Sequence, residues 1–290
     1  MKLTILGSGT SHGVPMLGCD CPVCRSPDSR DRRLRSSLYV QGSRGERAVI
    51  DTGPEFRLQA IGAGITRLDA IFLTHSHADH IHGMDDVRPL SREAPLPVYG
   101  NRETIEELQE RFSYVFKETQ RGGGKPKLLP VQVSAPVAVG GLLFSPVPVK
   151  HGALDILGWR IEEEKAEEAG NWGGGGRKAG GWGVGNRACA VYLTDTSAIP
   201  DSSWPLISGP DILIIGALRT RPHETHFTFE EALDTAVKTG APRSFLTHIC
   251  HDYNHREIEA YCRSYQENRG LRRLVMGPAY DGLELIVETA

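Results

Sequence analysis

Short apolar runs separated by polar and glycine-rich stretches recur along the chain, and they predict strands with helices between them. The following runs are predicted as strands because they are short and rich in β-branched and aromatic residues: 3–6, 37–40, 48–50, 70–73, 143–149, 190–193, 212–215 and 245–246. Segments with apolar positions at helical spacing are 102–111, 229–239 and 256–268, with Thr228 as the N-cap of the second. Many strands mixed with helices indicate a layered α/β fold.

One segment, at about 162–187, differs in composition from the rest of the chain. It begins with acidic residues and continues into a stretch dominated by glycine, with two tryptophans. Such a composition cannot bury a hydrophobic core, so we expect a flexible surface insertion between two strands and assign it no function. There is no internal repeat, and the length of 290 residues fits a single domain over residues 1–290.

Net charge and hydropathy argue against several classes of protein. The net charge of −3 carries no signature of polyanion binding, so nucleic acid is not the favoured partner. No apolar run is long enough to cross a membrane, and the first one ends at a glycine turn too early for a signal peptide. We therefore expect a cytoplasmic protein without membrane association. The oligomeric state is left open, with a homodimer as one option.

A dense group of metal-ligand residues follows one predicted strand. His75, His77, Asp79, His80 and His82 lie within eight positions of the chain. A divalent cation satisfies imidazole and carboxylate groups at this density, whereas a solvated histidine-rich loop is the alternative. His75 and His77 are two apart on an extended segment and point to the same side, while Asp79 and His80 lie at a helix start. The loop can therefore supply two neighbouring metal positions.

Four predicted strands end in a single polar residue of metal-ligand type: Asp51, His151, Asp195 and His248. Ligands gather at the carboxyl ends of strands in open α/β sheets, so we expect these side chains to converge on the histidine loop. Each of them alone would be interpreted as a capping residue or a satisfied core residue. Four in succession beside the histidine loop favour a metal site.

The order of these residues resembles the metallo-β-lactamase superfamily. The stretch from His75 to His80, followed by His151, Asp195 and His248, matches the order of the metal motifs of that superfamily over most of the chain. The resemblance implies an αββα four-layer sandwich with a dinuclear zinc or manganese site at one edge of the sheets. Histidine and carboxylate ligands suit both metals, so the residues do not choose between them.

The resemblance also implies a ligand set for each ion. The first ion takes three histidines: His75, His77 and His151. The second takes an aspartate and two histidines, and a further aspartate bridges the two ions: Asp79, His80, His248 and the bridging Asp195. Asp51 matches a family aspartate that binds no metal and instead orients the histidine loop. His82 departs from the pattern and is interpreted as a helix-surface residue.

Three cysteines form a second cluster with C-x-C-x2-C spacing: Cys19, Cys21 and Cys24. Such spacing in a turn lets three thiolates face one ion, and a fourth ligand would complete a tetrahedral zinc site. From the residues alone, either Cys250 or His251 can supply it. A redox dithiol and buried free thiols are the alternatives, while three cysteines within six residues argue against a disulfide scaffold.

The cysteine cluster, the glycine loop at 7–15 and the segment 247–251 together resemble the PhnP-like branch of cyclic phosphodiesterases. In that branch the three cysteines and the second histidine of the last motif bind a structural zinc. The resemblance therefore implies that His251 completes the site formed by Cys19, Cys21 and Cys24.

A histidine-rich segment before the predicted helix 229–239 bears on catalysis. The PhnP-like branch and the related tRNA 3′-processing nucleases place a catalytic histidine there, and His226 matches it. Such a residue can protonate the leaving oxygen of a phosphodiester. His223, in the same segment, and His12, in the glycine loop, are further candidates for contacting the substrate.

The function implied by the resemblance is hydrolysis of a small or cyclic phosphodiester by a hydroxide that bridges two divalent ions, zinc or manganese. His226 and the metal-binding carboxylates of Asp79 and Asp195 form the implied catalytic set, and one structural zinc completes the cofactors. The alternatives are a tRNA 3′-end nuclease and an accessory protein of pyrroloquinoline quinone biosynthesis. An ester, lactone or thioester hydrolase is a further alternative, against which the cysteine cluster and His226 argue.

Overall fold

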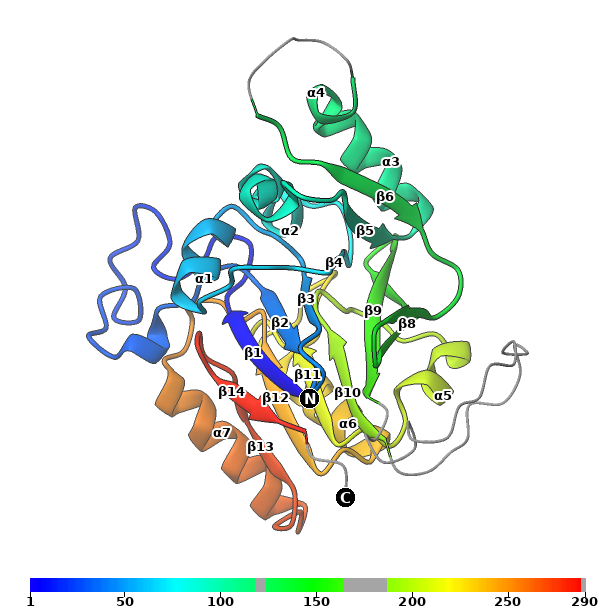
Figure 1. The fold of residues 1–290 in the computed structure, drawn as a ribbon. Coiled ribbons are helices and arrows are strands. Elements are labelled where there is room, and N and C mark those ends of the chain that lie inside the picture. The colour runs from blue at the N-terminus through cyan, green and yellow to red at the C-terminus, as the bar shows by residue number, and fades with distance from the viewer. Residues whose placement is uncertain (118–123, 164–186, 288–290) are drawn as a thin grey trace.

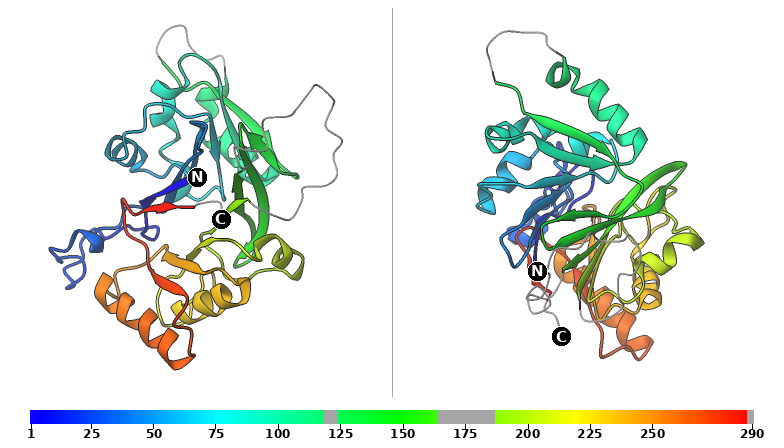
Figure 2. Two further views of the ribbon diagram at one scale, coloured as in Figure 1. Left: turned by 60° about the horizontal axis from the view of Figure 1, so that its bottom comes forward. Right: turned by 45° about the vertical axis from the view of Figure 1, so that its right-hand side comes forward.

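The protein folds into two facing β-sheets with helices on both outer sides (Figure 1). The computed structural model describes residues 1–117, 124–163 and 187–287. In Figure 2 the cyan helices lie on one side of the paired sheets, and the yellow and orange helices lie on the other. The four layers are helix, sheet, sheet and helix, so the expected αββα sandwich is confirmed.

The first sheet has the strand order β14-β1-β2-β3-β4-β5-β6. In that order the strands are Glu284–Ile286, Lys2–Gly7, Ser37–Gln41, Arg47–Ile50, Ala70–Phe72, Leu96–Gly100 and Leu128–Gln132. Strands β3 to β6 run parallel, while β14, β1, β2 and β3 pair antiparallel. The carboxyl ends of β3 and β4 therefore reach the same edge of the sheet.

The second sheet has the order β13-β12-β11-β10-β9-β8-β7. In that order the strands are Val275–Pro278, Arg243–Thr247, Ile212–Gly216, Ala188–Leu193, Leu154–Glu163, Leu142–His151 and Val137–Val139. Strands β10 to β13 run parallel, and β7 to β10 pair antiparallel. Because β8 and β10 both run antiparallel to β9, the carboxyl ends of β8, β10 and β12 all lie at one edge.

Helices cover the outer face of each sheet with apolar side chains. The first sheet packs against α1, η2, α3 and α4, which span Phe56–Gly62, Met84–Ser91, Arg102–Arg111 and Ser113–Phe116. The second packs against α5, α6 and α7, which span Trp204–Ile207, Phe229–Thr239 and His255–Asn268. The short helices α2, η1 and η4 span Ala78–Ile81, Ser29–Asp31 and Asp201–Ser203. Across the described ranges, no helix is both long enough and apolar enough to cross a membrane.

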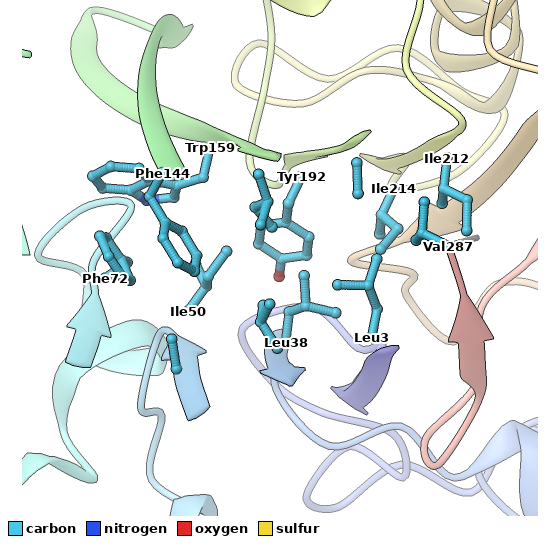
Figure 3. Close-up of a cluster of buried hydrophobic side chains, with 14 of the residues drawn as sticks. Leu3, Leu38, Ile50, Phe72, Phe144, Trp159, Tyr192, Ile212, Ile214 and Val287 are labelled. Carbon is cyan, nitrogen blue, oxygen red and sulfur yellow. The ribbon is translucent and has the colours of Figure 1, made fainter. Parts of the chain in front are cut away.

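Large aromatic side chains fill the space between the two sheets (Figure 3). Phe72 of the first sheet stacks on Phe144 of the second, with ring centroids 3.9 Å apart. Fully burying such a side chain contributes about 1.5–3 kcal/mol, so this layer is a main source of stability. Trp159 of β9 also donates from Nε1 to the carbonyl of Leu73 at 3.3 Å, just before the histidine loop. The core thus holds the start of that loop against the second sheet.

The strands predicted from the apolar runs are confirmed, and the predicted helices form with nearly the expected ends. Helices α3 and α6 have the predicted bounds, and α7 begins one residue earlier than expected, at His255. Thr228 caps α6 through a full capping box with Glu231. Strands β5, β6, β7, β9, β13 and β14 escaped the pattern analysis, because they are short or because charged residues, glycine or proline interrupt their apolar residues.

The predicted insertion at about 162–187 lies almost entirely outside the described residues. The strands on either side of it do pair: β9 and β10 are antiparallel, with Glu163 opposite Ala188.

Candidate metal centre

Three residues that follow strands adopt left-handed backbone conformations. Asp51 follows β3, Asp195 lies two residues beyond β10 and His248 follows β12, and their φ angles are 62°, 52° and 57°. They are the non-glycine residues with positive φ within the ranges the structure describes. This conformation costs an ordinary residue about 1–2 kcal/mol, and such strain clusters at functional sites. Three such residues at one edge of the sandwich make this edge a candidate functional site.

Three histidines meet at one side of this edge. His75 and His77 come from the loop after β4, and His75 Nε2 lies 3.0 Å from His77 Nδ1. The rings of His75 and His151 are 5.4 Å apart, and the three residues can place their ligand atoms around one ion. His151 Nδ1 donates to the carbonyl of Thr225 at 2.8 Å, which leaves the Nε2 lone pair free for a metal.

Carboxylates dominate the second half of the site. Asp79 and Asp195 lie within ligand reach of His248, whose Nδ1 is 3.1 Å from Asp195 Oδ2. His80 Nε2 lies 3.1 Å from Asp79 Oδ2 and 3.2 Å from Asp195 Oδ2. His80 Nε2 is nevertheless a buried nitrogen without a well-formed hydrogen bond. An unpaired buried nitrogen facing two carboxylates fits a cation position, so this donor set suits a bound metal.

Asp51 holds the histidine loop from behind. Its carboxylate accepts the Thr74 amide at 2.8 Å and the Thr74 hydroxyl at 2.7 Å. It also accepts His80 Nδ1 at 2.7 Å. The proton on Nδ1 leaves His80 Nε2 pointing at the carboxylates, as a metal ligand would.

The electrostatics of the site fit cation binding. Burial holds the pKa of His75 well below its ordinary value, and burial also lowers the pKa of His77 and His248. The neutral imidazole is the form that binds metals. Burial opposes ionisation of Asp195, but His248 and His80 hold the pKa of that carboxyl well below its ordinary value. Burial opposes protonation of His80, but Asp195, Asp79 and Asp51 raise the pKa of that imidazole well above its ordinary value, so a cation bound there would replace its proton.

His226, the predicted catalytic histidine, lies against this cluster. Its ring stacks on His248 with centroids 4.8 Å apart and lies 4.8 Å from the His151 ring. Its Nδ1 is 3.8 Å from Asp195 Oδ1. Burial, and then the neighbouring His248, lower the pKa of His226 to about 3. The ring is therefore neutral near pH 7 and close enough to exchange a proton with a group bound at the carboxylates.

The remaining candidate histidines lie at the periphery. His223 is exposed, and its ring is 5.1 Å from that of His226. His12 is exposed and contacts Ser11 Oγ at 3.5 Å. His82 is exposed and packs edge-on against Phe112, away from the ligand groups. The structure thus brings His223 beside the cluster, and it leaves His12 and His82 outside the ligand groups.

The cysteine cluster forms a second ligand group around one histidine nitrogen. His251 Nδ1 lies 3.3 Å from Cys19 Sγ, 3.4 Å from Cys21 Sγ and 3.5 Å from Cys24 Sγ. At a tetrahedral zinc with usual bond lengths, a thiolate sulfur and an imidazole nitrogen would be about 3.5 Å apart. Cys250 is buried and stays outside this group. The geometry therefore favours His251 over Cys250 as the fourth ligand.

Several contacts around the site were not found from the sequence. The hydroxyls of Thr10 and Ser36 lie 3.1 Å and 3.2 Å from the two ring nitrogens of His248. The buried Arg33 donates to the carbonyls of Cys250 and Tyr253 at 2.6 Å and 3.0 Å, on either side of His251. Thr10 lies in the glycine loop that contributed to the resemblance. A hydroxyl or a main-chain carbonyl has no signature in the residue pattern, so the sequence did not reveal these contacts.

The sandwich and its clustered ligands define a class: metal-dependent hydrolases with the metallo-β-lactamase fold. A family model described as "Beta-lactamase superfamily domain" matches residues 46–249, and the chain belongs to that family.

Two relatives known from sequence are similar to the chain. An octanoyltransferase of Porphyromonas gingivalis (strain ATCC BAA-308 / W83) is 35% identical over 99% of this chain and 52% of the relative. The chain thus spans about half the length of that protein. A ribonuclease Z of Pyrobaculum neutrophilum is 25% identical over 90% of this chain and 92% of the relative.

Two solved structures are similar in fold. A diphosphatase from the PhnP family superposes with a TM-score of 0.79 at 39% identity, covering 100% of this chain and 98% of that one. Zinc-bound PqqB from Methylobacterium extorquens superposes with a TM-score of 0.71 at 18% identity, covering 99% and 100%. The second similarity concerns the fold alone.

Proposed function

We propose that the protein hydrolyses a small or cyclic phosphodiester at a dinuclear metal centre. The observation that carries this proposal is the position of His226, whose ring stacks on His248 and lies beside Asp195. A histidine at this place can assist the departure of an alkoxide leaving group, and a phosphodiester is the substrate class that the resemblance of this segment implies. The similarity at 39% identity to a diphosphatase of the PhnP family supports phosphorus chemistry.

The proposed ligands divide into two sets that share one carboxylate. The first set is His75, His77 and His151, and the second is Asp79, His80 and His248, with Asp195 common to both. Two divalent cations held there would supply Lewis-acid stabilisation of phosphoryl oxygens and a nucleophilic water at neutral pH. Zinc and manganese both suit these ligands.

The protein residues have distinct proposed roles in the reaction. Asp79 and Asp195 offset the charge of the bound cations and fix their positions. His226, whose ring is neutral at rest and 13% exposed, first takes a proton from the attacking water or from solvent and then gives that proton to the leaving oxygen. His223, exposed beside His226, and His12, on the glycine loop, are proposed to contact the substrate.

The cysteine cluster is proposed to hold a structural zinc. Its four ligands come entirely from the protein: Cys19, Cys21, Cys24 and His251. Sites with four protein ligands are closed and stabilise the fold, whereas catalytic sites keep a position open. We further propose that residues 1–290 form one hydrolase domain and act in the cytoplasm on a small substrate.

The first experiment combines elemental analysis with a substrate panel. Purified protein loaded with zinc or manganese is offered linear and cyclic phosphodiesters, a diphosphate diester and p-nitrophenyl acetate. Turnover of at least one phosphorus ester well above that of the acetate is expected. Preference for the carboxylic ester would contradict the proposal.

Two substitutions separate metal binding from proton transfer. Asp195→Ala is expected to lose active-site metal, because it removes the carboxylate shared by both ligand sets. His226→Ala is expected to keep both metals and to lose about 10²–10⁴-fold in turnover, the usual contribution of a general acid. Full turnover of metal-loaded His226→Ala would remove the acid role, and loss of one metal would make His226 a ligand instead.

A tRNA 3′-end nuclease is the second candidate, favoured by the similarity to a ribonuclease Z over 90% of this chain. Cleavage of a precursor tRNA in preference to bis(p-nitrophenyl) phosphate would support it. A non-hydrolytic role in quinone cofactor assembly would instead show tight binding of a quinone precursor and no phosphodiester turnover. This chain spans only about half the length of the octanoyltransferase, so we do not propose octanoyl transfer as its activity.

A further inference from the structure

Asp281 lies between β13 and β14, far along the chain from the candidate metal ligands, yet its carboxylate binds two segments that lead to the site. Oδ1 accepts the amide and the hydroxyl of Ser8, both at 2.8 Å. Oδ2 accepts the amide of Leu34 at 2.6 Å. One carboxylate therefore joins the loop after β1 to the segment before β2.

Both of these segments lead to residues that contact His248. Two residues after Ser8, the hydroxyl of Thr10 lies 3.1 Å from His248 Nε2. Two residues after Leu34, the hydroxyl of Ser36 lies 3.2 Å from His248 Nδ1. The two hydroxyls thus contact the imidazole of His248 at its two nitrogens.

Further hydrogen bonds make the two segments and His248 one unit. Ser36 Oγ donates to the carbonyl of Gly9 at 3.0 Å, which ties the segments to each other. The amide of Ile249 donates to the carbonyl of Ser8 at 2.9 Å, so the residue after His248 is bound to the same loop. A shift of Ser8 would therefore move both the backbone and the ring partners of His248.

His248 needs such support because its own backbone does not favour its position. Its φ of 57° is a strained conformation that persists only where surrounding contacts over-determine it. Its ring is almost fully buried and faces Asp195. A small rotation of this ring would change the distance between its Nδ1 and the carboxylate of Asp195.

We propose that Asp281 is a positioning residue for His248 and thereby sets the affinity of the second metal position. The inference rests on the proposed function only in taking His248 as a metal ligand. Hydrogen-bond partners that orient ligands from outside the first coordination layer commonly contribute 10–100-fold in metal affinity. Asp281 acts one step further out, through Ser8 and Leu34.

The test compares Asp281→Asn with a matched control. The asparagine keeps the size of the side chain but turns an N–H donor toward the Leu34 or the Ser8 amide, so one bond becomes a conflict between two donors. The control is Asp69→Asn: Asp69 Oδ2 accepts the amide of Arg47 at 2.8 Å, at the opposite end of strand β3 from Asp51. Each variant loses one bond between a carboxylate and a main-chain amide in or beside the strands of the first sheet.

The measurement is a titration of apo protein with Co²⁺ in competition with a chelator, read from the absorption spectrum, with folding checked by urea unfolding. Asp281→Asn is expected to bind the first equivalent of the dinuclear site normally and the second about 10-fold or more weakly. Asp69→Asn is expected to bind both like the wild type. Wild-type affinity for both equivalents in folded Asp281→Asn would overturn the proposal, as would an equal loss in Asp69→Asn.

A milder variant covers the case in which Asp281→Asn does not fold. Ser8→Ala removes the hydroxyl bond to Asp281 and leaves both amide bonds in place. It is expected to weaken the second equivalent by a smaller factor, and an unchanged second equivalent would then overturn the proposal. Failure of the wild type to hydrolyse phosphodiesters would contradict the proposed function alone, because the metal titration is read without turnover.

Discussion

At the residue scale, the histidine loop depends on a carboxylate that binds no metal in our proposal. Asp51 accepts hydrogen bonds from the amide and hydroxyl of Thr74 and from His80 Nδ1. Burial raises the pKa of Asp51, and the contacts with His80 and Thr74 oppose that rise. The carboxylate is valuable because it accepts from several donors at once, which no neutral side chain of its size can do.

Asp51→Asn tests this role directly. The amide group must turn one N–H toward a donor, so the free energy of unfolding is expected to fall by about 1–3 kcal/mol. Metal affinity is expected to fall about 10–100-fold, because His80 loses its orientation. Asparagine tolerates the left-handed backbone, so strain at φ 62° does not confound the result. Urea unfolding and chelator competition measure the two effects, and unchanged metal affinity would contradict the assigned role.

At the element scale, the start of helix α6 helps to position His226, which lies two residues before the N-cap Thr228. Thr228 caps the helix, with its hydroxyl accepting the Glu231 amide at 3.2 Å and Glu231 Oε2 accepting the Thr228 amide at 2.8 Å. The amide of Phe227 donates to the carbonyl of Thr196 at 2.8 Å, next to Asp195. The helix start and the strand end are therefore bound together at the place where His226 meets the carboxylates.

Thr228→Ala is expected to cost about 1 kcal/mol in the free energy of unfolding, the usual value of an N-cap. It is also expected to lower turnover several-fold, since the segment carrying His226 loses one of its anchors. The matched control is Asn101→Ala, which removes the N-cap of α3, where Asn101 Oδ1 accepts the Thr104 amide at 2.8 Å. A similar loss of stability without a change in kcat is expected there. Equal kcat values for the two variants would show that the cap of α6 does not position His226.

At the scale of the whole molecule, one short segment joins both ligand groups. His248 faces the carboxylates, and three residues later His251 faces the thiols. The buried guanidinium of Arg33 donates to the carbonyl of Cys250, which lies between these two histidines in the chain, and to the carbonyl of Tyr253, which follows them. The cysteine cluster therefore adjoins the segment that carries His248, a ligand of the proposed dinuclear site.

Metal removal is expected to occur in two stages. Fully loaded protein is expected to hold close to three ions per chain, as the proposed ligand sets require. A mild chelator is expected to remove two of them first, because an open catalytic site exchanges faster than a closed one with four protein ligands. Elemental analysis after timed chelation measures this order. A single tightly held ion in loaded protein would contradict the dinuclear centre.

The pattern of the sequence predicted elements well where apolar runs were continuous. Strand β11, with the sequence Ile-Leu-Ile-Ile-Gly, and helix α6, with its capping box, were recognised because local residues alone specify them. Strand β6 contains a proline and pairs at the edge of its sheet, and β9 mixes charged residues with apolar ones. Such strands are defined by their neighbours, and the chain alone does not show those neighbours.

By itself, the sequence determined the chemistry of the site: which residues can bind metal, and that several of them follow strands. Ligand type and spacing are local properties, so His75, His77, Asp79 and His80 were evident before any folding was considered. The tertiary structure alone decided which groups face one another. It brought His226 onto His248, chose His251 over Cys250 beside the thiols, and placed the Asp281 carboxylate on two distant segments. These contacts join residues far apart in the chain, where only the packing of the two sheets sets the distance.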